Sequence, residues 1–339
     1  MRYAFFGRDT HHVDLQRHLL LANALGHEVI SDLSVLDHAS AAKLLFSDSC
    51  DTKTLLKIKR AQQNGKISKV SVIILELFNV DFQAWREELT FLLKSEARSN
   101  WKAILYFLLV VPLKIRLIQG ILSFGSTEAI IPSQLRVNYL KTRLSQNIVY
   151  TVLRNKPILK QFQVKVPIDF ESQTEQVKEI VAGGNFIFIG GRINVETEFF
   201  TVCAFASQNN LKVLAATGQF DMMQRSVIKF PGLIISLGKI SNEFVMYLSS
   251  RCLAGLCLYH NATSNQRLSA SSKFFEFMLI NKTIIASDNP GMLAEVQHST
   301  EPLVIPINKL TEGMKIERTE ALINEEYSFE NEIEDYKIN

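Results

Sequence analysis

The stretch SASSKFFEFMLINKTIIASDNPG, residues 269–291, contains the transition that decides the fold. Small and hydroxylic residues precede Lys273, and a short apolar segment with one acid, Glu276, follows. We expect a helix that begins near Ser272 or Lys273, and then a strand buried on both faces, as in a parallel sheet. A helix followed at once by a buried strand is the repeating unit of a doubly wound α/β fold.

The same alternation extends over both halves of the chain. In the first half we expect strands at Tyr3–Phe6, Glu28–Ser31, Val70–Leu75, Glu128–Pro132 and Asn147–Leu153, and helices at Val13–Leu25 and Ser133–Ser145. In the second half we expect strands at Phe186–Ile189, Lys212–Ala216, Leu233–Leu237 and Gly255–Tyr259, and helices at Phe199–Ser207 and Asn242–Arg251. The pattern predicts the α/β class, with two Rossmann-like, doubly wound domains.

We place the domain boundaries so that residues 1–160 and 161–310 form these two domains. Residues 311–339 form a third segment, and its acidic part, 317–339, is expected to be a helix that packs back on the first domain.

Composition restricts the function. The net charge of +3 gives no case for a nucleic-acid partner. The four cysteines lack the spacing of a metal site, no acidic metal-binding triplet occurs, and the N-terminal apolar run is too short for a signal peptide. We therefore expect reduced thiols, a cytoplasmic location and no metal.

The opening stretch has the chemistry of a nucleotide diphosphate site. In open parallel sheets, ligands bind beyond the carboxyl ends of the strands. A helix N-terminus there offers free N–H groups to a phosphate, and Lys273 adds a full positive charge. Glu276 lies one turn beyond Ser272, where a carboxylate can accept two ribose hydroxyls. The alternative is that Glu276 is an ordinary helix acid paired with Lys273, and the spacing alone does not separate the two.

Five further segments, in order, extend the pattern. They are EAIIPSQLRVNYL (128–140), VYTVLRNKP (149–157), FIFIGGR (186–192), VLAATGQ (213–219) and LGKISNEFVMYLSSRCLAGLCLY (237–259). Together with residues 269–291 they resemble the two-domain (GT-B) glycosyltransferases of the large retaining family. The resemblance covers most of the chain from about 125 to 291. It implies an N-terminal acceptor-side domain and a C-terminal nucleotide-sugar domain that face a cleft.

The resemblance also implies roles for particular residues. The positions that match donor phosphate contacts are Gly191, Arg192, Ser271, Ser272 and Lys273, and Glu276 matches the ribose-binding acid. Gly7 matches the loop of the acceptor domain that approaches the donor. Two positions depart from the family pattern. Val195, Glu196 and Thr197 stand where many relatives have a lysine, and Leu268 stands where many have a first glutamate, so that Asn265 becomes a candidate for contacts with the donor sugar.

Three histidines lie where strands are expected to end. His11 and His12 follow the first strand, where an imidazole could orient the acceptor hydroxyl or steady charge on the sugar. His260 follows a strand of the second domain, beside the expected cleft. Exposed loop histidines without a role are the alternative for each.

Residues 101–120 are the most hydrophobic stretch, WKAILYFLLVVPLKIRLIQG. Their uncharged part, Ala103–Leu113, is too short to span a bilayer, and Pro112 is expected to kink it. The stretch is either a buried element of the first domain or a basic, aromatic surface that rests on anionic lipid.

We predict a metal-independent glycosyltransferase, of the hexosyltransferase class, that uses a nucleotide-diphospho-sugar, with UDP the favoured nucleotide, and no cofactor. The acceptor is a surface glycan or a lipid-linked saccharide, which suggests polysaccharide biosynthesis at the inner face of the plasma membrane. Two alternatives remain. One is a non-catalytic GT-B-like subunit that binds a glycan or a partner enzyme, and the other is a sugar-nucleotide isomerase.

Overall fold

The structure of the chain is a computed structural model that describes residues 1–6, 12–94, 101–144, 147–159, 166–296 and 303–338. It divides into two compact units. Unit 1 comprises Met1–Arg154, Ala262–Ser269 and Glu332–Asn339, and unit 2 comprises Asn155–Asn261 and Ala270–Asn331. The chain passes between the units at several points, whereas the sequence analysis placed contiguous domains with boundaries at 160 and 310.

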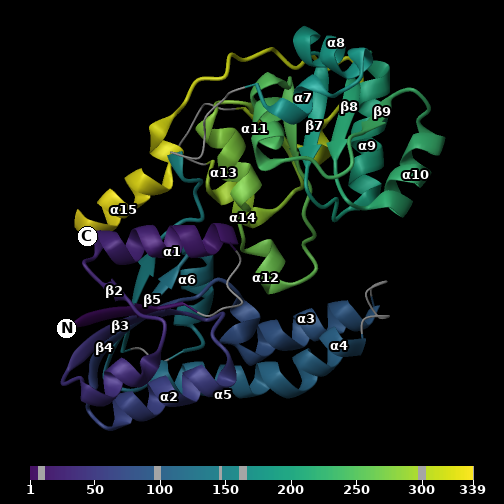
Figure 1. Cartoon of the computed structure of the whole chain (residues 1–339). Coiled ribbons are helices and arrows are strands. Elements are labelled where there is room, and N and C mark those ends of the chain that lie inside the picture. The colour runs from purple at the N-terminus through teal and green to yellow at the C-terminus, as the bar shows by residue number, and fades with distance from the viewer. Residues whose placement is uncertain (7–11, 95–100, 145–146, 160–165, 297–302, 339) are drawn as a thin grey trace. The chain divides into compact units, whose positions relative to one another are not determined.

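Unit 1 is built on a six-stranded parallel sheet (Figure 1). Its strands are β1 (Arg2–Phe5), β2 (Glu28–Val29), β3 (Ala42–Ser47), β4 (Ile67–Ile73), β5 (Ser126–Ile131) and β6 (Ile148–Val152). Their order is β2-β1-β3-β4-β5-β6. The chain first adds β2 on one side of β1 and then adds β3 to β6 on the other side. This is a doubly wound sheet, and the predicted α/β class is confirmed. The sequence analysis missed only β3 among these strands.

The helices of unit 1 cover both faces of the sheet, and Figure 1 shows α1 and α2 on opposite sides of it. They are α1 (His12–Ala24), η1 (Leu33–His38), α2 (Thr52–Gln63), η2 (Leu77–Asn79), α3 (Phe82–Lys94), α4 (Trp101–Leu105), η4 (Tyr106–Val110), α5 (Val111–Leu122), α6 (Gln134–Lys141) and α12 (Ser264–Arg267). Local sequence sets their starts. Asp51, for example, caps α2 by accepting a hydrogen bond of 2.7 Å from the backbone N–H of Thr54.

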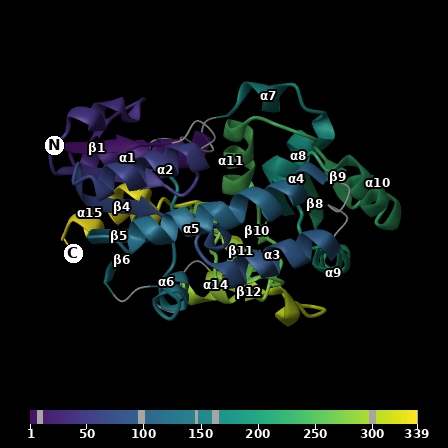
Figure 2. The ribbon, with the colours of Figure 1, turned by 90° about the horizontal axis from the view of Figure 1, so that it is seen from below.

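Helices α4 and α5 form one continuous helix with the π-helical segment η4 between them, and it runs beside α3 (Figure 2). Pro112 does not break this helix. In the π register, the N–H of Val111 bonds to the carbonyl of Tyr106, so the next bond would run from residue 112 to Phe107. Proline has no N–H, and the indole N–H of Trp85 on α3 donates to the Phe107 carbonyl instead, at 2.7 Å. The helix is therefore longer than the sequence predicted.

The C-terminal segment differs from the expected long helix. Only α15 (Phe329–Ile338) and a short 3₁₀ turn, η7 (Glu325–Tyr327), are helical in the described part of 317–339. From Glu332 onward α15 belongs to unit 1. There Tyr336 donates a hydrogen bond of 2.8 Å to Glu128 of β5, and Glu332 forms an ion pair of 3.2 Å with Arg154.

Unit 2 contains a second six-stranded parallel sheet. Its strands are β7 (Phe186–Gly190), β8 (Lys212–Ala216), β9 (Ile234–Ser236), β10 (Ala254–Cys257), β11 (Thr283–Ala286) and β12 (Val304–Pro306). The order is β12-β11-β10-β7-β8-β9, so the first strand of the unit lies at the centre and the chain winds outward in both directions. This is the strand order of a dinucleotide-binding Rossmann sheet. Its switch point lies between β7 and β10.

The helices of unit 2 follow the strands in alternation. They are α7 (Ile168–Glu171), α8 (Glu175–Gly183), α9 (Glu196–Gln208), α10 (Phe220–Lys229), α11 (Asn242–Arg251), α13 (Ser272–Leu279), α14 (Pro290–Ala294) and the 3₁₀ turn η6 (Ile307–Lys309). Two apolar clusters form the core, one on each face of the sheet. Because a helix between two parallel strands runs antiparallel to them, the N-termini of these helices lie at the carboxyl edge of the sheet.

The position of α13 depends on a glycine in the neighbouring strand, at residue 255. A Cβ atom added to Gly255 of β10 would lie 2.2 Å from the ring of Phe277, which α13 presses against the strand. Phe277 is fully buried. Glycine at 255 therefore lets α13 approach β10 more closely than any side chain would allow.

Candidate functional site: the carboxyl edge of the unit 2 sheet

The switch point of the unit 2 sheet places a glycine turn and an exposed cation at its carboxyl edge. β7 ends at Gly190, and Gly191 follows with φ of +104°, a conformation that favours glycine. The side chain of Arg192 comes next and is exposed. Its guanidinium forms no hydrogen bond or ion pair with any described residue. Arg192 is thus available to an anionic ligand.

The N-terminus of α13 lies at the same edge. Ser271, not Ser272, is its N-cap, since the Ser271 hydroxyl accepts a hydrogen bond of 3.1 Å from the N–H of Phe274. The ammonium of Lys273 contacts the carboxylate of Glu276 at 2.5 Å, and both side chains are about one-fifth exposed. The pairing that was the alternative for Glu276 is therefore present.

Electrostatics show that these residues gather where β10 ends. Burial, with the nearby Cys257 and Glu276, raises the pKa of the Tyr259 hydroxyl to about 12, and a hydrogen bond with Ser271 opposes the rise. Burial likewise raises the pKa of the Cys257 thiol, with Lys273 opposing and Glu276 reinforcing the shift. The residues predicted from the 269–291 stretch thus meet the end of the strand beside the switch point.

A third cation that the sequence analysis did not select also lies at this edge. Lys239 follows β9, and its Cε would be 2.8 Å from a Cβ on Gly218, which follows β8. The lysine side chain is exposed and lies over the glycine. The signal in the sequence was its place after a strand, in the segment LGKIS.

An acid was missed as well. Glu198, on the first turn of α9, accepts a hydrogen bond from the hydroxyl of Ser287, which follows β11. Burial raises the pKa of Glu198, while Ser287 and His260 oppose the rise. His260 is therefore close enough to interact with Glu198. This acid lies one residue beyond the neighbourhood where relatives place a lysine, so the edge carries both charge signs.

Asn265 does not lie in unit 2. Residues 262–269 belong to unit 1, where the Asn265 side chain accepts hydrogen bonds from the N–H of Leu77 at 2.9 Å and from Arg136 at 3.0 Å. It also donates to Glu76 at 2.6 Å. Leu268, at the position of the expected glutamate, packs against the unit 1 core. The amide of Asn265 is occupied by protein groups, which disfavours its candidate role with the donor sugar.

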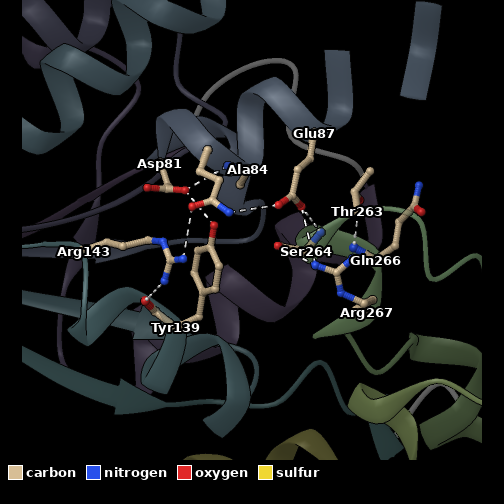
Figure 3. Close-up of polar contacts among 10 residues, drawn as sticks. Asp81, Ala84, Glu87, Tyr139, Arg143, Thr263, Ser264, Gln266 and Arg267 are labelled. Atoms are coloured by element: carbon tan, nitrogen blue, oxygen red, sulfur yellow. Dashed lines mark hydrogen bonds and ion pairs between the residues drawn. The ribbon is translucent and has the colours of Figure 1, made fainter. Parts of the chain in front are cut away.

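Figure 3 shows how unit 1 holds the start of α12. The carboxylate of Glu87 on α3 accepts a hydrogen bond of 2.6 Å from the N–H of Ser264 and lies 3.7 Å from Arg267. Partial burial raises the pKa of Glu87, but hydrogen bonds with Ser264 outweigh it and hold the pKa below its usual value. Beside it, Tyr139 donates to Asp81 at 2.8 Å. The first turn of α12 is thus neutralised by the protein's own acid.

Three of the predicted site residues follow the first strand in sequence. Gly7 and His11 lie outside the described residues, and only the backbone of His12, the first residue of α1, is described. Among the residues that the structure describes, no group of three histidine, cysteine or acidic side chains could hold a metal ion.

Comparison with solved structures supports the fold. The HepE protein of Anabaena, solved in complex with UDP, aligns with a TM-score of 0.56 at 12% identity over 92% of this chain and 87% of its own. The α,α-trehalose-phosphate synthase (UDP-forming) of Burkholderia xenovorans, solved with glucose-6-phosphate, gives 0.55 at 9% identity over 95% and 76%. The sucrose-phosphate synthase of Thermosynechococcus elongatus gives 0.53 at 12% identity over 92% and 87%.

No protein-family model and no curated sequence matches the chain. The structural likeness, together with two doubly wound parallel sheets, confirms the fold that the sequence motifs predicted. The chain has the GT-B fold.

Proposed function

We propose that the chain is a glycosyltransferase that takes its sugar from a nucleotide-diphospho-sugar, with UDP as the nucleotide. The observation that carries the proposal is the cationic carboxyl edge of the unit 2 sheet. It combines the exposed Arg192 with the N-terminus of α13 and the Lys273–Glu276 pair at a Rossmann switch point. Arginine and free N–H groups suit a diphosphate, and a carboxylate suits ribose hydroxyls.

The proposed chemistry is stabilisation of the leaving group. As the bond from the anomeric carbon to the phosphate oxygen breaks, the diphosphate leaves with the electron pair, and Arg192 and Lys273 neutralise its charge. The acceptor hydroxyl forms the new bond to the anomeric carbon and gives up its proton. His11 and His12 remain candidates to orient that hydroxyl. With these cations we propose that a hexose is transferred without a metal ion or a cofactor.

The acceptor belongs to the same proposal. A growing surface glycan or a lipid-linked saccharide at the cytoplasmic face of the membrane fits the apolar helix Trp101–Leu122, whose length and composition alone would suffice to cross a membrane. These features suggest a place in polysaccharide biosynthesis of the cell envelope.

Nucleotide binding by Arg192→Ala tests the donor site. A thermal-shift panel of nucleoside diphosphates should show stabilisation by UDP, because a ligand of the folded state raises stability by mass action. Loss of one charge-assisted contact should weaken UDP binding about 10- to 100-fold. Arg251→Ala is the matched control, since Arg251 ends α11 at the opposite edge of the sheet. Equal UDP affinity in the two variants would contradict the proposed site.

Transfer itself is measured as release of UDP from UDP-sugars, with a chelator present to test metal independence. Activity that disappears with the chelator and returns with a divalent cation would refute that part of the proposal.

A second candidate function has a specific observation in its favour. Glu198 lies at the carboxyl edge near the expected phosphate lysine, and Leu268 is packed into unit 1. Both departures fit a non-catalytic GT-B subunit that binds a glycan or a partner enzyme. A protein that binds UDP but never releases it from any UDP-sugar would favour this function.

A further inference from the structure

One face of unit 1 exposes apolar side chains along the N-terminal part of the helix Trp101–Leu122. Leu109 is 70% exposed and Trp101 is 62% exposed, and Leu105, Leu108 and Leu113 are each more than 40% exposed. Their spacing places them on one stripe of the helix. Isolated exposed leucines are common, but a contiguous stripe of this kind marks an interaction surface.

The other side of the same helix is already occupied. Phe107 packs against Phe78 at a ring distance of 5.1 Å, and its carbonyl accepts the hydrogen bond from Trp85. This anchoring fixes which side faces outward. The exposed stripe is therefore a defined surface of unit 1, which we call the α4–α5 face: Trp101, Leu105, Leu108, Leu109 and Leu113.

Charge around the α4–α5 face has a single sign. The helix contains Lys102 and Arg116, both exposed, and no acidic residue. On α3, the exposed Arg86 and Lys94 add positive charge. The two acids of α3 are instead engaged at the start of α12: Glu87 accepts a hydrogen bond from the N–H of Ser264, and Glu88 interacts with the side chain of Thr263.

Arg116 also lines a cavity of about 400 Å³ together with Arg143. Arg116 follows Leu113 by about one helical turn, on the same side of the helix. Apolar side chains bordered by cations complement a bilayer with anionic headgroups.

The helix cannot leave unit 1 to cross a membrane. By length and composition it is the one helix of the described residues that could span a bilayer, but 33% of its most apolar stretch is buried. Val111, Ile115, Ile118 and Ile121 are fully buried in unit 1. Extracting these four side chains would leave a cavity in the core of unit 1 and would destabilise the unit. A surface contact keeps the core intact.

We propose that the α4–α5 face docks unit 1 on an anionic lipid bilayer, with the helix lying in the plane of the interface. Trp101 and the four leucines enter the boundary between headgroups and acyl chains, and Lys102 and Arg116 contact headgroup phosphates. The docking does not require the transferase activity, but the membrane-side acceptor of the proposed function rests on the same helix.

Co-flotation of the full chain with vesicles tests the docking. We expect binding to vesicles of phosphatidylcholine mixed with phosphatidylglycerol, weaker binding to phosphatidylcholine alone, and a decrease with salt. Leu109→Ser should weaken partitioning about tenfold, because one inserted leucine is lost. The matched control is Ile228→Ser, which alters an even more exposed aliphatic residue, of α10 in unit 2, and should bind as the unaltered chain does.

Fluorescence gives a second readout. The chain has two tryptophans, and vesicles should shift the emission of Trp101 to the blue, a shift that Trp101→Phe should abolish while Trp85 remains. The proposal is overturned if Leu109→Ser binds vesicles as strongly as the Ile228→Ser control does, or if the unaltered chain does not bind anionic vesicles. It is also overturned if Leu109→Ser only converts a dimer to a monomer, because the face would then join two copies of the chain.

UDP-induced stabilisation separates this proposal from the donor site. Leu109→Ser should retain it fully, and Arg192→Ala should retain vesicle binding.

Discussion

Glu276 has two possible partners, and the choice between them decides whether it recognises a nucleotide. In the structure its carboxylate contacts Lys273 at 2.5 Å, three residues away on the same helix. A partly exposed pair of this kind contributes little stability, since pairs at this spacing give a few tenths of a kcal/mol. Exchange of the ammonium for two ribose hydroxyls would therefore cost little.

The variant Glu276→Gln distinguishes the two roles when UDP is compared with 2′-deoxy-UDP. If the carboxylate accepts a hydrogen bond from the 2′-hydroxyl, the substitution should weaken UDP binding about tenfold and 2′-deoxy-UDP binding much less. Isothermal titration gives both constants. A purely structural pair with Lys273 would instead lower both affinities equally, and that result would remove Glu276 from the site.

The position of α13 depends on a contact between two elements, because Gly255 of β10 leaves room for the ring of Phe277. The sequence indicated the helix and the strand from their apolar patterns. It could not indicate this close packing, since nothing local links residues 255 and 277. The same contact sets where Lys273 and Glu276 lie at the carboxyl edge.

Gly255→Ala should therefore destabilise unit 2 by about 1–3 kcal/mol, the usual cost of overpacking a core. Urea unfolding measures the loss, and Phe277→Leu in the same chain should recover part of it by shortening the ring. Gly183→Ala is the control, because Gly183 ends α8 with nothing within 4 Å of the added Cβ. If Gly255→Ala left the free energy of unfolding unchanged, α13 would be free to shift away from β10.

Elements with continuous apolar runs were predicted well, and those shaped by distant contacts were not. Lys212–Ala216 and Asn242–Arg251 have the predicted bounds. The strand β3, Ala42–Ser47, was missed although four of its six residues are apolar, because Lys43 interrupts the run. In the segment 317–339 acidic composition suggested one helix, but helical structure there is confined to η7 and α15.

At the scale of the whole molecule, sequence patterns could not predict which segments of the chain belong to which unit. Residues 262–269 and 332–339 belong to unit 1, although they are far in sequence from its main part, Met1–Arg154. The first segment is held by buried polar groups: Arg136 donates to the Asn265 carbonyl at 2.8 Å. An asparagine in a polar stretch carries no local sign of such a partner, and for this reason it was a candidate for the donor sugar instead.

The C-terminal segment is tied to unit 1 by a hydrogen bond whose strength depends on pH. Glu128 accepts it from Tyr336, and although burial raises the pKa of this carboxyl, hydrogen bonds with Tyr336 and Ser71 and the charge of Lys69 outweigh burial and lower the pKa below 4.5. A depressed pKa means that the unfolded chain takes up the proton first as the pH falls. The stabilisation is therefore complete at neutral pH and is lost in acid, as the pH falls through the folded value.

Tyr336→Phe should remove about 1–2 kcal/mol of stability at pH 7, because it takes away a hydrogen bond to a charged acceptor. The difference from the unaltered chain should shrink below pH 4.5, where Glu128 begins to be protonated in the unfolded state. Urea unfolding across this range measures both effects. Tyr150→Phe of β6 is the matched control, since its buried hydroxyl has no partner among the described residues and its loss should be nearly neutral. A difference that stays constant down to strongly acid pH would show that Tyr336 contributes through its ring alone, and that Glu128 does not hold α15 on unit 1.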